Sequence, residues 1–546
     1  MRINVDLTPG FSSRWNPSGE LTAVEFDFLY AMIDLNTPIP NAVVYAIAFL
    51  ILTFAINLLW QLLPRKKSEP PLVFHWIPFI GSAISYGLNP FEFFTNCRKQ
   101  YGDIFTFVLL GRKITAYLGV DGNDFILNGK LRDVNAEDVY GALTTPVFGK
   151  DIIYDCPNEK LMEQKKFIKF GLTQKALESY VPLIEQEVLE YIKTSPNFKG
   201  SSGIVDIPAA MAEITLFTAS RALQGAEVRR KLTAEFADLY HDLDLGFQPI
   251  NFIMPWAPLP QNQRRDSAHA KMTETYLELI NKRRATKDSE ETGTQNDGTD
   301  MILNLMGSIY KDGQVLSDTN IAHLMITLLM AGQHSSSSSS AWIMLRLASR
   351  PDIVEELYQE QINNIGSPDQ PLQYSDLNKL HLLQNVVKET LRVHSSIHSL
   401  MRKVKNPMPV PNTEFVITPD KVLLASPIMT HLNEEHFANP LVWDPHRWDD
   451  VVEVESKEDM VDYGYGAISK GTRSPYLPFG AGRHRCIGEK FAFLNLVTIV
   501  STLVRNFKVA TIDGKSWVPP TDYTSMFSRP VQPANIRWER RFPGQA

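Results

Sequence analysis

The chain is 546 residues long, of which 44% are hydrophobic and 21% charged. This composition is that of a folded protein with a sizeable core, and it excludes bulk disorder. Lys and Arg number 54 against 61 Asp and Glu, and the net charge of −7 argues against nucleic-acid binding through a general positive field. Three cysteines, Cys97, Cys156 and Cys486, make no disulfide framework and favour a reducing compartment or one reactive thiol.

An apolar run from Ala42 to Leu63 is the first predicted element. At about 1.5 Å per residue, a helix of this length crosses the roughly 30 Å hydrocarbon core of a bilayer. Basic residues follow at 65–67, so the positive-inside rule places the remainder of the chain in the cytosol. A buried core helix and a cleaved signal peptide are the alternatives, and the missing basic flank before the run argues against the signal peptide. We therefore expect residues 1–63 to form a lumenal segment and a membrane anchor, with the helix at about 42–63.

The proline-rich stretch at 64–81 predicts a stiff connector, and no comparable break divides residues 82–546, which we expect to form one catalytic domain. Polar stretches at 287–300 and 449–462 are predicted to be surface loops. Helical patterns dominate from about 160 to 400, and strand-like runs occur at 104–111, 113–120 and 414–426. The predicted fold class is mainly α with small β-sheets.

Residues 479–488 read FGAGRHRCIG and lead directly into a helical pattern. Cys486 therefore lies where a glycine-rich loop enters a helix, and the exposed N–H groups of a helix start favour a thiolate there. Arg483 and Arg485 add positive charge, so we expect an ionised thiol that is available to a metal. An inert, half-buried cysteine is the alternative.

This loop resembles the haem-binding signature of the cytochrome P450 superfamily, F-x-x-G-x-[RH]-x-C-x-G, with every fixed position filled. The resemblance implies that Cys486 is the thiolate ligand of haem iron and that Phe479, Gly482 and His484 belong to the haem-binding loop. The implied fold is the single large haem-thiolate monooxygenase fold. The implied cofactor is haem b, which acts with O2 and with electrons derived from NADPH.

Two further marks of that superfamily precede the cysteine loop in the expected order. Glu389-Thr390-Leu391-Arg392 fits E-x-x-R, and Arg447 lies in the later segment PHRW. Alone, such a pair at i and i+3 is any surface salt bridge, worth well under about 1 kcal/mol. In this order, the resemblance implies that Glu389, Arg392 and Arg447 form a buried structural network behind the haem.

A long helix is predicted from Thr319 to Arg346, although six consecutive serines at 335–340 alternatively suggest a flexible linker. The flanking Ile, Leu, Met and Trp residues favour a continuous helix, and small residues at 331 and 332 leave a gap suited to oxygen and water. In the family, an acid and a threonine on this helix help to deliver protons during catalysis. Here His334 and Ser335 fill those positions and are the implied catalytic residues. A core histidine satisfied by a backbone carbonyl is the alternative.

The block at 140–166 is similar to that of the fungal sterol 14α-demethylases: a tyrosine, TTPVFGK, YDCPN and EQKK. Further similar blocks lie at 246–252, 398–404 and 523–527. The resemblance implies an enzyme of ergosterol biosynthesis that removes the 14α-methyl group of lanosterol or eburicol as formate in three oxygenations. The implied ligands of the haem propionates are Tyr140, Tyr154, Lys165, Arg402 and His484. The implied lining of the sterol pocket is Tyr140, Leu143, Phe148, Phe247, Phe252, Ala331, Ile397, Ser399, Met526 and Phe527.

The sequence carries no dinucleotide or flavin motif, so the electrons must come from a partner. The resemblance implies an NADPH-dependent diflavin reductase and a place in the endoplasmic reticulum membrane. Residues 464–490 carry a local excess of positive charge that suits an acidic partner domain. Its members are Lys470, Arg473, Arg483, Arg485 and Lys490 against Glu489.

Three other functions remain alternatives to this reading. A haem-thiolate isomerase or dehydratase would rearrange peroxides without oxygen or a reductase, and a membrane haem carrier or sensor would catalyse nothing. NADPH-dependent oxygen consumption separates both from a monooxygenase. Among oxygenases, another membrane-bound sterol or fatty-acid hydroxylase is the alternative.

Overall fold

The computed structural model describes residues 41–231, 234–288, 301–367, 369–450, 460–462, 467–469, 471–525 and 527–542. The chain divides into two compact units, Met1–Leu63 and Pro64–Ala546. Most of the two polar stretches predicted at 287–300 and 449–462 lies outside the described residues.

The described part of the first unit is the helix α2, Asn41–Leu62, which confirms the predicted apolar helix. It is long and apolar enough to cross a membrane, and none of its side chains is buried. Its polar side chains bond within the helix itself: Thr53 Oγ1 donates to Phe49 O at 2.7 Å, and Gln61 Nε2 donates to Asn57 O at 3.2 Å. Such internal pairing is what a hydrocarbon environment requires of polar groups.

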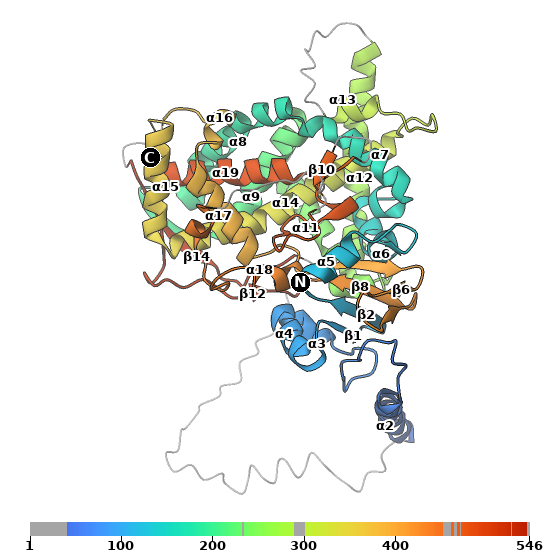
Figure 1. Ribbon diagram of the computed structural model, residues 1–546. Helices are drawn as coiled ribbons and strands as arrows, with labels where there is room; N and C mark the ends of the chain where they lie inside the picture. The colour runs from blue at the N-terminus through green and yellow to red at the C-terminus, as the bar shows by residue number, and fades with distance from the viewer. Residues whose placement is uncertain are drawn as a thin grey trace, which may run out of the picture. The chain divides into compact units, whose positions relative to one another are not determined.

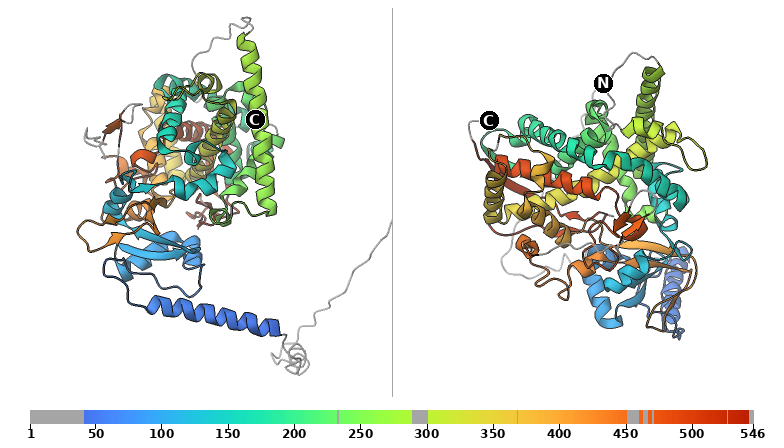
Figure 2. Two further views of the ribbon diagram at one scale, coloured as in Figure 1. Left: turned by 90° about the vertical axis from the view of Figure 1, so that its right-hand side faces the viewer. Right: turned by 45° about the horizontal axis from the view of Figure 1, so that its top comes forward.

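The second unit is mainly helical, with a five-stranded sheet at one side of the helices and α14 among them (Figure 1); the long light-green helix α12 runs along one edge (Figure 2). Its helices are α3 Ala83–Leu88, α4 Pro90–Tyr101, α5 Gly119–Leu127, α6 Glu137–Phe148, α7 Asn158–Ile168, α8 Gln174–Thr194, α9 Ile207–Ala219, α10 Ala226–Lys231, α11 Ala234–Asp244, α12 Pro260–Asp288, α13 Met301–Met306, α14 Asp318–Ala348, α15 Pro351–Asn364, α16 Tyr374–Leu377, α17 His381–Val393, α18 Pro427–His431 and α19 Glu489–Asn506. Short 3-10 turns include η1 Ile153–Asp155, η6 Pro249–Phe252, η7 Pro445–Trp448 and η9 Gly482–His484.

The larger sheet has the strand order β1-β2-β8-β5-β3, in which β2 and β8 are parallel and the other neighbours antiparallel. Its strands are β1 Ile104–Leu109, β2 Arg112–Tyr117, β3 Val134–Asn135, β5 Leu400–Val404 and β8 Lys421–Ala425. Leu110 and Gly111, both at positive φ, form the tight turn between β1 and β2, the backbone geometry that suits a two-residue hairpin. Strands predicted at 104–111, 113–120 and 414–426 are confirmed, and the last of these comprises two strands.

The remaining strands form small antiparallel sheets. One sheet has the order β11-β14-β4, and the other three are pairs: β12 with β13, β6 with β7, and β9 with β10. Their bounds are β4 Ser202–Asp206, β6 Met408–Pro409, β7 Val416–Ile417, β9 Met460–Asp462, β10 Ala467–Ser469, β11 Phe507–Thr511, β12 Thr521–Asp522, β13 Arg529–Pro530 and β14 Asn535–Arg540.

Part of the proline-rich segment 64–81 lies along β1. Thr106 N donates to Pro71 O at 2.7 Å, and Val73 N donates to Thr106 O at 2.7 Å. Because proline has no N–H to contribute to a ladder, the segment makes isolated bridges to the sheet rather than a full strand.

The helix α14 confirms the predicted continuous helix through the serine run. Ser317 caps its first turn by accepting a bond from Asn320 N at 3.1 Å. Serine hydroxyls within it donate to backbone carbonyls, as Ser340 Oγ does to Ser336 O at 2.7 Å, so the run bonds locally without leaving the helix. The helix packs against α9, α12, α17 and α19, and this burial outweighs the weak helix propensity of serine.

Candidate functional site

The cysteine loop depends on one glycine for its path. Gly482 has φ +67°, and a Cβ built on it would lie 2.3 Å from Leu127 O in α5. The loop therefore passes closer to α5 than any other residue type allows. Cys486 N donates to Phe479 O at 3.0 Å, which closes the loop just before α19 begins at Glu489.

The sulfur of Cys486 faces an enclosed space. The side chain carries exposed surface, yet burial among protein atoms raises the pKa of its thiol. The two findings agree when the exposed surface borders an internal space rather than bulk solvent. The Gly488 N–H, Lys165 and Arg485 lower the pKa, but desolvation outweighs them. This direction of the pKa shift runs against the expectation of a thiol that is ionised before it meets a metal.

The central helix α14 borders the same space. Ala331 is exposed although Met330, beside it, is 1% exposed, so the small side chain of Ala331 faces an opening inside the molecule. Ile487, next to Cys486, packs against the hydrophobic cluster that contains Met330. The cysteine loop and this part of α14 thus pack against the same hydrophobic cluster. The hydroxyl of Ser335 donates to Ala331 O at 3.1 Å, one helical turn along α14.

Two tyrosines and a histidine form a row beside the cysteine loop. The Tyr140 and Tyr154 ring centroids lie 5.4 Å apart, and those of Tyr154 and His484 lie 5.9 Å apart. The Tyr140 hydroxyl oxygen accepts a bond from Met401 N at 2.9 Å, which leaves its own proton for an acceptor. The sequence predicted that these three residues share a site, and the structure brings them together.

Cations gather at the same place. Lys165 Nζ donates to Arg483 O at 3.1 Å, and Arg402 Nη1 donates to Met401 O at 2.8 Å. Burial, reinforced by the charge of Arg402, lowers the pKa of Lys165 to about 8. Burial and the charges of Arg402, Lys165 and Arg483 hold the pKa of His484 well below its usual range. Positive groups are thus crowded into a desolvated region.

This donor set fits the propionates of a haem. Within the described part of the chain, Lys165 and Arg402 form no ion pair with a carboxylate, and the buried Nδ1 of His484 has no hydrogen-bond partner. Buried cations and donors without an anion are costly, and two ligand carboxylates satisfy them through charge-assisted hydrogen bonds. With the Cys486 sulfur facing the enclosed space, the residues present fit a haem-thiolate group.

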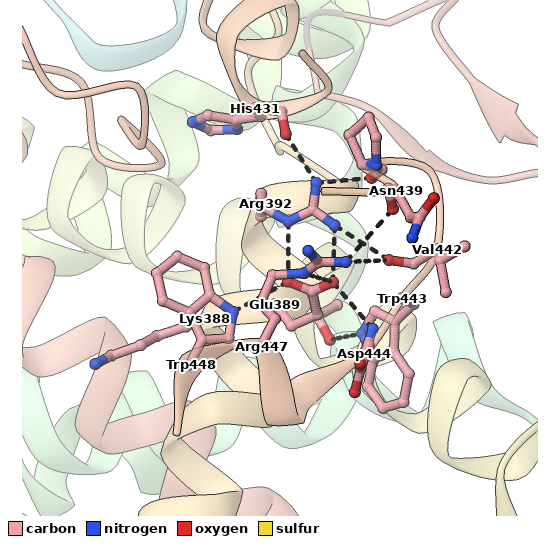
Figure 3. Close-up of polar contacts among 12 residues, drawn as sticks. Lys388, Glu389, Arg392, His431, Asn439, Val442, Trp443, Asp444, Arg447 and Trp448 are labelled. Atoms are coloured by element: carbon pink, nitrogen blue, oxygen red, sulfur yellow. Dashed lines mark hydrogen bonds and ion pairs between the residues drawn. The ribbon is translucent and has the colours of Figure 1, made fainter. Parts of the chain in front are cut away.

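The residues of the E-x-x-R pattern form a fully buried network (Figure 3). Glu389 and Arg392 are each 0% exposed and bond at 2.7 Å, and Arg447 Nε donates to Glu389 Oε1 at 3.1 Å. Trp448 Nε1 donates to the other carboxylate oxygen at 3.0 Å. Arg392 Nη1 donates to His431 O at 2.8 Å, so the network joins α17 to the chain around α18 and η7. The surface salt-bridge alternative is thereby excluded.

His334 lies among aromatic rings beside a carboxylate. Its Nε2 is 3.4 Å from Asp244 Oδ1, within ion-pair distance but without hydrogen-bond alignment. The imidazole stacks on Phe527 with centroids 5.3 Å apart and 17° between planes. Burial lowers the pKa of His334 and Asp244 opposes that shift. The alternative of a histidine satisfied by a backbone carbonyl does not describe this environment.

The predicted sterol-lining residues divide into groups. Phe148, Phe247 and Phe527 form edge-to-face contacts at 5.7–5.8 Å and lie in or against one hydrophobic cluster with Leu143 and Phe252. Ile397 and Ser399 lie between α17 and β5, where Ser399 bonds the buried His398 Nδ1 at 2.8 Å. Ala331 borders the enclosed space. Met526 lies outside the described residues.

Sequence reasoning missed Asp244, the carboxylate beside His334. It lies 90 positions earlier in the chain, on α11, and only its adjacency to the similar block at 246–252 was a signal. The predicted charge excess at 464–490 is also partly neutralised. Arg473 pairs with Asp124 at 3.1 Å and Arg485 with Glu489 at 2.8 Å, and Lys470 lies outside the described residues.

The fold and the site together define a haem-thiolate oxygenase: a mainly helical body, a cysteine facing an enclosed space and a cationic edge for propionates. The cytochrome P450 family model matches residues 70–538, so the chain belongs to the cytochrome P450 family. A retinoic acid-bound cyanobacterial CYP120A1 shares the fold, with a TM-score of 0.71 at 19% sequence identity, over 87% of this chain and 100% of that one. The protein is accordingly a haem monooxygenase that takes O2 and electrons from a redox partner.

Curated relatives are much more similar. A sterol 14-alpha demethylase of Aspergillus flavus is 68% identical over 91% of this chain and 96% of its own length. A sterol 14-alpha demethylase of Gibberella zeae is 66% identical over 92% and 99%. An eburicol 14-alpha-demethylase of Penicillium italicum is 63% identical over 91% and 97%.

Proposed function

We propose that this chain is a sterol 14α-demethylase of ergosterol biosynthesis. It removes the 14α-methyl group of lanosterol or eburicol as formate in three oxygenations that consume O2 and NADPH-derived electrons. The observation that carries the proposal is 68% and 66% identity to two sterol 14-alpha demethylases over more than nine tenths of this chain and of each relative. The cluster of Phe148, Phe247 and Phe527 supports it, because steroid pockets are mainly apolar.

Each part of the haem site has a proposed role in this reaction. Cys486 is the metal ligand, and Phe479 and Gly482 shape the loop that presents it. Reductive activation of O2 is the chemistry that haem supplies when bound. The propionates are held by Tyr140, Tyr154, Lys165, Arg402 and His484. The buried network of Glu389, Arg392 and Arg447 is structural.

His334 and Ser335 are the proposed catalytic residues. His334 Nε2 holds the proton, because Asp244 lies 3.4 Å away and favours the imidazolium against the desolvation that opposes it. Ser335 Oγ, the next side chain along α14, passes a proton toward the enclosed space. An imidazole can both accept and donate a proton, which suits this role.

The proposed enzyme binds a sterol in an apolar pocket, is held at a membrane and receives electrons from a partner protein. The sterol pocket comprises Tyr140, Leu143, Phe148, Phe247, Phe252, Ala331, Ile397, Ser399, Met526 and Phe527. Residues 1–63 form a lumenal segment and a single-pass anchor in the endoplasmic reticulum membrane, 64–81 a connector and 82–546 the cytosolic catalytic domain. An NADPH-dependent diflavin reductase supplies the electrons, since the sequence has no dinucleotide or flavin motif of its own.

Product analysis tests this function. The purified full chain is incubated with diflavin reductase, NADPH, O2 and either lanosterol or eburicol, and the products are identified by mass spectrometry. We expect a 14-demethylated sterol with a 14,15 double bond, together with formate. A hydroxylated sterol that keeps its 14α-methyl group favours another hydroxylase, and turnover without NADPH and O2 favours an isomerase. Cys486→Ser is the control, which should lose the reduced-CO band of thiolate-ligated haem.

A further inference from the structure

A buried histidine at the end of α18 holds one definite tautomer. His431 is 0% exposed, and its Nε2 lies 2.7 Å from Leu477 N. A backbone amide donates only, so Nε2 is the acceptor and the ring proton must be on Nδ1. Nδ1 lies 2.8 Å from Ser395 Oγ, which accepts that proton. Burial and the nearby Arg392 charge lower the pKa of His431 to about 3, which keeps the imidazole neutral.

Leu477, whose backbone N–H donates to His431, lies just before the cysteine loop in the chain. Leu477 N donates to His431, and Leu477 O accepts from Gly480 N at 3.1 Å, which closes a tight turn over 477–480. Phe479, inside that turn, supplies the carbonyl that accepts Cys486 N at 3.0 Å. One hydrogen bond therefore joins the Cys486 backbone to the 477–480 turn, and a second joins that turn to His431.

The other side of His431 is held by the Glu389 network. Its carbonyl accepts from Arg392 Nη1 at 2.8 Å, and Ser395 lies just beyond the C-terminal end of α17, which carries Glu389 and Arg392. The Tyr476 ring lies 5.5 Å from the imidazole, and its hydroxyl donates to Lys388 O at 3.1 Å on the same helix. His431 thus contacts the network through its backbone and the cysteine loop through its ring.

We propose that His431 is a positioning residue that couples the buried Glu389–Arg392 network to the cysteine loop and fixes the Cys486 backbone for iron ligation. The role rests on the proposed function of Cys486 as the haem ligand. It follows from geometry, because Leu477 N donates to His431 Nε2 at 2.7 Å and both atoms lie in the buried interior. Without the Nε2 acceptor, the 477–480 turn loosens and the Cys486 amide loses its fixed partner.

A pair of nearly isosteric variants tests the coupling. In His431→Gln the amide oxygen reaches the position of Nε2 and keeps the acceptor for Leu477 N, whereas the shorter His431→Asn reaches only the position of Nδ1. Ile428→Val, on the same short helix and 2% exposed, is the control for general damage to the core. All variants are studied as full-length holoprotein.

The readouts are the reduced-CO spectrum and hydrogen exchange of the peptide covering 476–488. For His431→Asn we expect a shift from the band of thiolate-ligated haem to that of neutral-thiol ligation, and exchange about tenfold faster or more in this peptide. For His431→Gln and Ile428→Val we expect parent behaviour in both readouts. Parent-like spectra and exchange in His431→Asn overturn the proposal, and so does equal damage in His431→Gln and His431→Asn.

Two outcomes separate this proposal from the function itself. If Cys486→Ser keeps the thiolate band, the ligand assignment fails and the positioning role fails with it. If Cys486→Ser loses the band while His431→Asn keeps it, only the positioning role fails. Should His431→Asn give no folded protein, His431→Leu decides, because leucine fills similar space but offers no acceptor to Leu477 N, and an unchanged spectrum and exchange in that variant overturn the role.

Discussion

At the scale of single residues, the environment of His334 decides which proton chemistry its imidazole performs. The His334 ring stacks on Phe527 and is buried, which favours the neutral imidazole. Asp244, at 3.4 Å from Nε2, favours the charged imidazolium. Burial outweighs Asp244, so the pKa of His334 lies below its usual range. Neither influence is visible in the local sequence around position 334.

Replacement of His334 by alanine tests the proposed relay. We expect turnover to fall, by up to the 10²- to 10⁴-fold typical of general acid–base catalysis, because no imidazole then delivers the proton. More NADPH should be spent on hydrogen peroxide, while sterol binding and the reduced-CO spectrum survive. Steady-state rates and peroxide assays measure both effects. Parent-level coupling would assign the proton to Ser335 or water, and collapsed sterol binding would make His334 a pocket-shaping residue.

Glu389 pairs with the buried guanidinium of Arg392 and the partly exposed one of Arg447, and its removal should lower stability. Glu389→Gln leaves Arg392, which is 0% exposed, without its anion, and removal of one partner of a buried ion pair typically costs about 3–5 kcal/mol. Denaturant unfolding followed by haem absorbance measures the loss. Glu356→Gln is the control: this carboxylate pairs with His446 at 3.1 Å but is 49% exposed, so its loss should cost about 1 kcal/mol or less. Equal stability of the two variants would contradict the structural role of Glu389.

At the scale of elements, the cysteine loop owes its shape to contact with α5 as well as to its own glycines. Gly482 at φ +67° and Gly480 at φ +69° share one backbone conformation but have different surroundings. A Cβ on Gly482 would meet Leu127 O at 2.3 Å, whereas a Cβ on Gly480 would meet only the flexible end of Leu400 at 3.6 Å.

The two glycines therefore form a matched pair for substitution by alanine. Both variants carry the cost of a left-handed alanine, about 1–2 kcal/mol. Gly482→Ala additionally forces the loop away from α5, so we expect loss of haem incorporation, measured as the ratio of haem to protein after purification. Gly480→Ala should retain haem. If Gly482→Ala binds haem as the parent does, the close approach to α5 is not required.

At the scale of the whole molecule, the second unit should fold without the first. Pro64–Ala546 is a compact unit with its own hydrophobic clusters. Removal of residues 1–63 should therefore give a folded haem protein that no longer behaves as an integral membrane protein. Carbonate extraction and the reduced-CO spectrum measure the two properties. Failure to incorporate haem would contradict the boundary at residue 63.

Buried histidines make the stability of the whole molecule depend on pH. Burial lowers the pKa of His398 to about 4 and that of His431 to about 3, and it holds the pKa of His394 well below its usual range. These groups stay neutral in the folded state while the unfolded chain takes up protons below about pH 6.5. Stability is therefore complete above that pH and falls progressively toward about pH 3.

Denaturant unfolding at a series of pH values measures this dependence. Between about pH 7 and about pH 5 we expect the unfolding midpoint to fall, since the unfolded state binds more protons over that range. His398→Gln should flatten the dependence, and substitution of the exposed His381 should leave it unchanged. A midpoint independent of pH would show that the buried imidazoles are not coupled to folding.

The sequence by itself determined the long apolar helix near the start of the chain, the class of fold, Cys486 in its glycine-rich loop and the long helix through the serines. These features follow from local causes: an apolar run, a spaced motif, and apolar residues that flank a weak helix former. Tertiary structure alone decided that Arg392 bonds the His431 carbonyl, that the carboxylate of Asp244 lies beside His334, and that the pKa of the Cys486 thiol is raised. Desolvation and charge depend on which distant segments come together, and spacing along the chain does not record that.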